Sequence, residues 1–418
     1  MPGPEHDHAR ECQRYFGEVV RPEELRLGRE RIARGLEELY VRRLRIPEGS
    51  ERAARLAQAV DDPDTVLVEI AHDGQIPHLG IVRMVLKTQE IAATVSKGLA
   101  VYLIGDHYSA DMRPRNLYLG LPLRGLDADH VKTPFSVSVG KKNRSVSFAS
   151  LPPPSPKALD DLESRAEQWV DHNASYAGRA ATSRPLRPAL HVQFELLRES
   201  ARLVRTFGDW LIRTQIAWID QMHGGPPSNL LVLPMTGIRE WLPDILAVIA
   251  DLDPGVDKTR GPATEASADS PPSRFWVYCA SCERRNRATW LSGTFEGSCV
   301  SCGSAIRARW PQDSLRVMPD IVAFEMALFH TGISGWVVGS RAPYLRDIQE
   351  SYRSEFGREM PPSFLLDSIP VFEGLGEPAG GHSRARLLRV LIEMDPRDLR
   401  EKLATPWEDN PVIRSPFL

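Results

Sequence analysis

The chain has 418 residues, 42% of them hydrophobic, and a formal charge of −3. A chain of this length can bury one large core or roughly two to three smaller ones. Its near-neutral charge gives no electrostatic case for non-specific binding to nucleic acid or to membrane surfaces.

The N-terminal residues are charged and lack the apolar core of a signal peptide. No stretch approaches the roughly 20 apolar residues that cross a bilayer. Four of the five cysteines fall in one short segment, and Cys12 stands alone. Clustered cysteines that bind metal fit a reducing compartment. We therefore expect a soluble cytoplasmic protein with no membrane partner.

The first half of the chain alternates predicted helices and strands. Apolar residues spaced by three and four predict two helices between residues 22 and 60. Residues 64–71 and 100–106 are continuous apolar runs typical of buried strands, and residues 80–98 between them predict a helix. Strand, crossover helix and strand form the parallel α/β unit, whose functional loops follow the carboxyl ends of the strands. The expected fold is therefore α/β with a Rossmann-like parallel sheet.

Later segments predict insertions in this fold. Residues 130–150 alternate as an antiparallel hairpin would, residues 157–223 are helical, and residues 229–236 form another strand. The predicted divisions are N-terminal helices (1–62), a first Rossmann-like half (63–150), a helical connective region (151–252), a flexible linker (253–273), a zinc ribbon (274–312), a second Rossmann-like half (313–372) and a C-terminal phosphate-loop-like segment with a helix (373–418).

Two C-x-x-C pairs give the most specific motif of the sequence. They are Cys279, Cys282, Cys299 and Cys302. Four thiolates at this spacing can surround one Zn²⁺ and leave it no open position, which indicates a structural zinc. A redox pair is the alternative. Nearby arginines raise the possibility of nucleic-acid contact, although a solvated arginine face is the favoured interpretation.

Two polar turns follow the first two predicted strands. The first contains Gly74, His78 and Gly80, where backbone N–H groups at the start of a helix favour an anion. The second contains Asp106 and His107, which could hold a substrate amine and a carboxylate or phosphate. Two polar turns converging on one sheet edge are what a ligand site requires, although such turns also occur without a ligand.

These motifs resemble the class I aminoacyl-tRNA synthetase and nucleotidyltransferase superfamily. Within it, the chain resembles the bacillithiol-synthesis cysteine ligase family, which joins cysteine to a glucosaminyl malate. The similar segments are Gly74-Gln75-Ile76-Pro77 with Leu79, the run VYLIGDHYSADMRP (101–114), and GWVVGSRAPYLRDIQESYRSEFGREMPPSFLL (335–366). The four-cysteine segment followed by EFGREMPPSFLL also resembles class I lysyl-tRNA synthetases.

The resemblance implies an amino-acid ligase, with ATP as the cosubstrate, that joins an amino acid (cysteine as the first candidate) to a small-molecule amine acceptor. It implies catalytic roles for His78, Asp106 and His107. The implied nucleotide-binding residues are Gly74, Gln75, His78, Gly80, Gly339, Ser340, His382, Ser383, Arg384 and Arg386. A related enzyme with a different substrate, and a non-catalytic RNA- or partner-binding paralogue, are the alternatives. The sequence does not predict the oligomeric state.

Overall fold

The computed structural model describes most of the chain. The described residues are 4–20, 22–73, 79–107, 137, 146–176, 183–252, 274–339, 352–354 and 356–366. Outside this part lie residues 74–78 and 340–351, which belong to the segments that resemble the cysteine ligase family, and the whole of residues 367–418.

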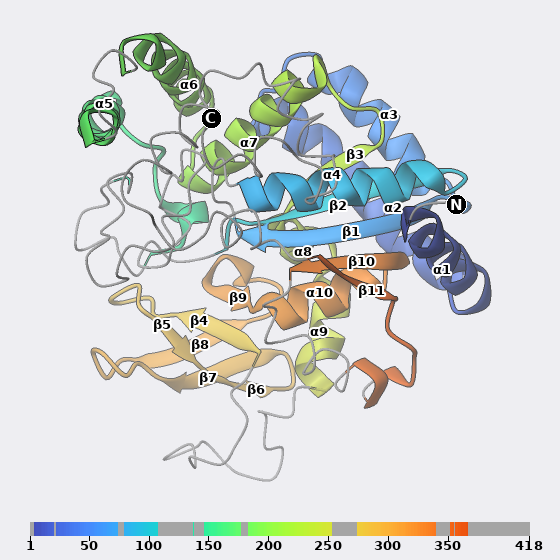
Figure 1. Ribbon diagram of the computed structural model, residues 1–418. Coiled ribbons are helices and arrows are strands. Elements are labelled where there is room, and N and C mark those ends of the chain that lie inside the picture. The colour runs from blue at the N-terminus through green and yellow to red at the C-terminus, as the bar shows by residue number, and fades with distance from the viewer. Residues whose placement is uncertain are drawn as a thin grey trace.

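A five-stranded, all-parallel sheet forms the centre of the molecule (Figure 1). Its strands are β1 (Val66–Asp73), β2 (Gly98–Gly105), β3 (Leu230–Pro234), β10 (Ile333–Gly339) and β11 (Ser363–Leu366). They are arranged in the order β11-β10-β1-β2-β3. β2 and β3 therefore lie on one side of β1, and β10 and β11, which come later in the chain, lie on the other side. The strand order thus reverses between β1 and β10.

Helices cover both faces of the sheet, because its strands are apolar on both sides. On one face lie α1 (Pro4–Glu18) and α4 (Leu79–Thr94), and on the other lie α8 (Met235–Trp241) and α10 (Ile321–Phe329) (Figure 1). A Cβ atom on Gly335 of β10 would lie 2.3 Å from the Sγ atom of Cys12, so α1 packs directly on the sheet at this glycine.

Further helices surround this centre. They are α2 (Pro22–Glu37), the π-helix η1 (Glu38–Arg43), α3 (Gly49–Asp61), α5 (Pro156–Tyr176), α6 (Ser183–Leu203), α7 (Phe207–His223) and α9 (Pro243–Leu252), with 3-10 turns η4 (Phe148–Ser150) and η6 (Ser314–Arg316). Arg29 of α2 is buried and donates to the carbonyl oxygens of Asp62, Thr65 and Thr331. These bonds join α2 to the segments that lead into β1 and β10.

Residues 274–319, the four-cysteine module, form two three-stranded antiparallel sheets. Their strands are β4 (Phe275–Tyr278), β5 (Arg285–Arg287), β6 (Thr289–Leu291), β7 (Thr294–Ser298), β8 (Ala305–Arg309) and β9 (Val317–Pro319). Trp290 Nε1 donates to Asp251 Oδ1 at 2.7 Å, and Trp310 Nε1 donates to the Pro243 carbonyl at 2.8 Å. Both indoles therefore anchor the module to α9 below the parallel sheet.

The structure confirms the α/β class and the parallel sheet. The predicted N-terminal region (1–62) contains α1 before the two helices predicted between residues 22 and 60, and the helix predicted to reach residue 98 ends at Thr94. Gly98 instead begins β2 and lies so close to α4 that a Cβ atom would be 1.9 Å from the Ala92 carbonyl oxygen. Most of the predicted hairpin at 130–150 lies outside the described residues. None of the described helices is long and apolar enough to cross a membrane.

Candidate functional site

The carboxyl edge of the parallel sheet collects the ends of three neighbouring strands. Asp73 of β1 pairs with Gly105 of β2, and Ile70 of β1 pairs with Val337 of β10. The last residue of β10, Gly339, therefore lies at the same edge. In open parallel sheets, ligands bind at this edge where the strand order reverses, which here is between β1 and β10.

The structure places the predicted nucleotide-binding residues only in part. Gly80 is the second residue of α4, the next described element after β1, and Gly339 ends β10. The other predicted residues lie outside the described part of the chain: Gly74, Gln75, His78, Ser340, His382, Ser383, Arg384 and Arg386. Their roles stay predictions.

Asp106 is fully buried at the end of β2. Its Oδ1 accepts from the Thr236 backbone N–H at 2.9 Å, and its Oδ2 accepts from the Thr236 hydroxyl. Burial raises the pKa of Asp106 to about 6, although the two Thr236 donors act in the opposite direction. Asp106 thereby joins β2 to the first turn of α8. A substrate amine would have to compete with Thr236 for this carboxylate, and the predicted amine-binding role stays untested.

His107 is buried beside Asp106, and its ring lies 5.2 Å from the ring of Phe324 in α10, centroid to centroid. Burial, together with the positive charges of Arg239 and Arg285, lowers the pKa of His107 to about 3. The imidazole is therefore neutral at physiological pH. A neutral ring can accept or donate a hydrogen bond, but it offers a carboxylate or phosphate no positive charge.

Thr236 and Arg239 contribute to the carboxyl edge but were not predicted from the sequence. Both lie in α8, which begins directly after β3. The segment LPMTGIRE (233–240) carried a usable signal, because polar residues there follow a buried strand in the same way that Asp106 and His107 follow β2.

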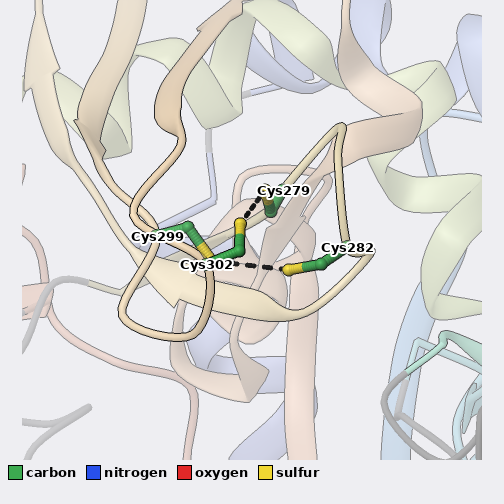
Figure 2. A group of neighbouring side chains, drawn as sticks. All are labelled: Cys279, Cys282, Cys299 and Cys302. Atoms are coloured by element: carbon green, nitrogen blue, oxygen red, sulfur yellow. Dashed lines mark hydrogen bonds between the residues drawn. The ribbon is translucent and has the colours of Figure 1, made fainter.

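The four cysteine side chains of the module point toward one another (Figure 2). Their sulfur atoms all lie within 4.8 Å of each other, with Cys279 Sγ 3.7 Å from Cys302 Sγ and Cys282 Sγ 3.5 Å from Cys299 Sγ. Four sulfurs at Zn–S distances of about 2.3 Å around one zinc ion lie about 3.8 Å apart. The cluster could therefore hold a metal ion such as zinc.

The two cysteine knuckles have the same backbone structure. In the first, the Cys279 N–H donates to the Arg284 carbonyl and the Glu283 N–H donates back to the Cys279 carbonyl, both at 2.9 Å. In the second, Cys299 forms the same pair of bonds with Ser304 and Gly303, also at 2.9 Å. Glu283 and Gly303 occupy equivalent places and have positive φ angles of 57° and 71°. This repeated turn directs both sulfurs of each knuckle inward.

Asn286 joins the two knuckles. Its Nδ2 donates to the Arg284 carbonyl at 2.6 Å, and its Oδ1 accepts from the Val300 N–H at 3.0 Å. The side chain is buried.

Backbone N–H groups of Cys282 and Ser281 lower the pKa of the Cys279 thiol, which favours the thiolate that a metal requires.

A pair of glutamates that sequence reasoning did not single out lies within the core. Glu69 of β1 and Glu325 of α10 are fully buried, and their carboxyl groups lie close enough to interact with each other. Among the described residues, none of their four carboxyl oxygens has a hydrogen-bond partner. Burial and the neighbouring charge of Glu325 raise the pKa of Glu69 well above its usual value, and burial raises the pKa of Glu325 to about 8. The pair therefore holds at least one proton at neutral pH.

Comparison of the chain with protein-family models gives no match, and comparison with curated proteins gives none either. The functional interpretation therefore depends on the chain's own residues and geometry.

Proposed function

We propose that this protein is an amino-acid ligase, with cysteine as the first candidate substrate, that joins the amino-acid carboxylate to a small-molecule amine. The observation that carries the proposal is the reversal of strand order between β1 and β10. The segments that resemble the cysteine ligase family leave β1, β2 and β10 at this shared carboxyl edge, where a Rossmann-like sheet binds nucleotides.

The chemistry of such a ligase requires positioning more than covalent help from the protein. The amino-acid carboxylate attacks the α-phosphate of ATP, pyrophosphate leaves, and the amine then displaces AMP to form the amide. We assign His78 and the backbone at Gly80 to the nucleotide phosphates, because N–H groups at a helix start favour anions. Arg384 and Arg386 are assigned to the developing phosphate charge.

Asp106 and His107 complete the assignment. We assign Asp106 to the substrate amine, directly or by fixing the β3–α8 turn through Thr236. The neutral state of His107 suits a hydrogen-bonding role toward the substrate rather than a charged one.

ATP–pyrophosphate exchange with single amino acids, followed by mass spectrometry of ligation products, tests this function. We expect exchange with cysteine, and a loss of about 100-fold or more in His78→Ala, because a group that stabilises transition-state charge has effects of this size. His191→Ala is the matched control, since His191 is an exposed histidine on α6. If no amino acid supports exchange or ligation, the ligase function is wrong, and RNA binding by the same preparation would favour the non-catalytic alternative.

We further propose that the four cysteines bind one structural Zn²⁺. Four protein sulfurs fill a tetrahedral site, so the ion has no position for a substrate. The module adjoins the sheet through α9, and its metal would therefore support the scaffold that carries the carboxyl edge.

A further inference from the structure

Arg239 has an unusual environment for a buried guanidinium. Its side chain is only 3% exposed, and its nearest carboxylate contact is Glu240 at 3.6 Å. Among the described residues, Nη1 meets only the Met318 sulfur, at 4.0 Å, and Nε has no hydrogen-bond partner. Buried charged donors are nearly always paired, because desolvation without a partner is costly. Within the described part of the chain, the Arg239 guanidinium therefore has only the long contact with Glu240 to balance its charge.

The four-cysteine module brings further positive charge to the same region. Trp276 of β4 lies opposite both Met318 of β9 and Arg287 of β5, so these three side chains share one face of the small sheet. The guanidinium carbons of Arg285 and Arg287 lie 4.5 and 3.5 Å from the centre of the Trp276 ring. Because Met318 contacts Arg239, this face of the module adjoins α8.

His107 is influenced by arginines of two different elements. The positive charges of Arg239, on α8, and Arg285, on β5, both act on its ring at the carboxyl edge of the parallel sheet. The nearby carboxylates have partners of their own. Asp106 accepts from Thr236, and Asp209 forms an ion pair with Arg43 at 2.8 Å.

We propose that Arg239 and Arg285 together bind an anionic group of the substrate, a carboxylate or a phosphate, next to His107 at the carboxyl edge. Arg239 supplies a buried Nε donor that has no partner among the described residues, and the Trp276 ring holds Arg285 in position through cation–π contact. The neutral ring of His107 completes the subsite without adding charge. This proposal depends on the proposed ligase function, whose substrates carry both kinds of anion.

Anion binding can be measured by isothermal titration calorimetry and thermal unfolding of the full chain. The probes are inorganic pyrophosphate and succinate, each compared with sodium chloride at equal ionic strength. We expect at least one of the two anions to bind and to raise the unfolding temperature. Binding of pyrophosphate alone identifies a phosphate subsite, and binding of succinate alone identifies a carboxylate subsite.

Three variants locate the binding. Arg239→Gln and Arg285→Gln should weaken it at least about tenfold, as expected when a charge-assisted hydrogen bond is removed. Arg307→Gln should bind like the wild type, since Arg307 lies on β8 of the same module, is 70% exposed and pairs with Glu296. If Arg239→Gln does not fold, Arg285→Gln decides, because that side chain is only partly buried. The subsite is wrong if neither anion binds better than chloride, or if Arg285→Gln equals Arg307→Gln.

The exchange and ligation assays on the same preparations separate the two proposals. Anion binding that depends on both arginines, without any ligation, would contradict the ligase and leave the subsite intact. Ligation with unchanged KM values in Arg239→Gln and Arg285→Gln would contradict the subsite alone.

Discussion

The carboxyl group of Glu69, on β1, lies beside the carboxyl group of Glu325, on α10, within the core of the protein, and both side chains are fully buried. Two like charges in such a place would repel each other and would both lack water. The pair is therefore compatible with the fold only when it carries a proton, which links the packing of α10 on the sheet to pH.

Stability should fall as pH rises through the titration of this pair. The pKa of Glu325 rises from about 4.5 to about 8 on folding, so its stabilising contribution is complete below pH 4.5 and is lost as pH approaches and passes 8. Glu325→Gln removes this titration. Relative to the variant, we expect the wild type to lose up to about 5 kcal/mol of unfolding free energy between pH 4.5 and pH 8.5, since each pKa unit is worth about 1.4 kcal/mol.

Urea unfolding at several pH values between 4.5 and 8.5 measures this difference. Glu37→Gln, which changes an exposed glutamate at the end of α2, is the control and should follow the wild-type pH dependence. If the unfolding free energies of Glu325→Gln and Glu37→Gln change with pH in the same way, the buried pair does not hold a proton whose loss destabilises the fold.

Removal of the metal should unfold or loosen the four-cysteine module. We expect about one zinc per chain by elemental analysis, and a lower unfolding temperature after treatment with a strong chelator, because bound metal stabilises the folded state by mass action. Cys302→Ser should lose most of the zinc. Cys12→Ala should keep it, since Cys12 lies in α1 and outside the module. Equal zinc contents in the two variants would overturn the metal assignment.

Asn286 should matter for metal affinity even though it is not a ligand. Asn286→Ala removes the bonds to the Arg284 carbonyl and the Val300 N–H, leaving two partly buried backbone groups without these partners. We expect a loss of about 1–3 kcal/mol in stability and a roughly 10- to 100-fold weaker zinc affinity by competition with a chromophoric chelator. Asn286→Asp keeps the acceptor for Val300 and should lose less. Zinc affinity unchanged in Asn286→Ala would show that the two knuckles hold their positions independently.

The contact between α1 and β10 can be tested by a double-mutant cycle. Gly335→Ala places a Cβ atom 2.3 Å from Cys12 Sγ and 3.1 Å from Phe364, so α1 must shift. We expect a cost of about 1–3 kcal/mol, typical of overpacking. In a Cys12→Gly background the sulfur is gone, and the additional cost of Gly335→Ala should be smaller by at least about 0.5 kcal/mol. Additive costs in denaturant unfolding would mean that α1 does not pack on Gly335.

The features predicted most reliably from the sequence were those encoded by nearby residues. Continuous apolar runs predicted β1 and β2 because both faces of a parallel sheet are covered. The C-x-x-C spacing predicted the cysteine cluster because each knuckle brings its two ligands together within one turn. Glu69 carried a signal that was not used, since a glutamate within an otherwise apolar run requires a special partner.

Contacts between distant segments could not be predicted in this way. On the side of β1 that faces away from β2, the neighbouring strand is β10, which begins only at Ile333. The environment of Asp106 likewise depends on Thr236, which is 130 residues away in the sequence. Turn chemistry at residue 106 indicated a polar group at the sheet edge, but the burial of that group is decided by α8, which only the folded chain brings there.

The position of β1 between β2 and β10 has a consequence for protein synthesis. A chain that leaves the ribosome N-terminus first can pair β1 with β2 early, but the opposite edge of β1 has no partner until Ile333 and the residues after it have emerged. An apolar strand edge left open for so long is a template for pairing with other chains. Truncation before β10 should therefore yield aggregates rather than a smaller folded protein.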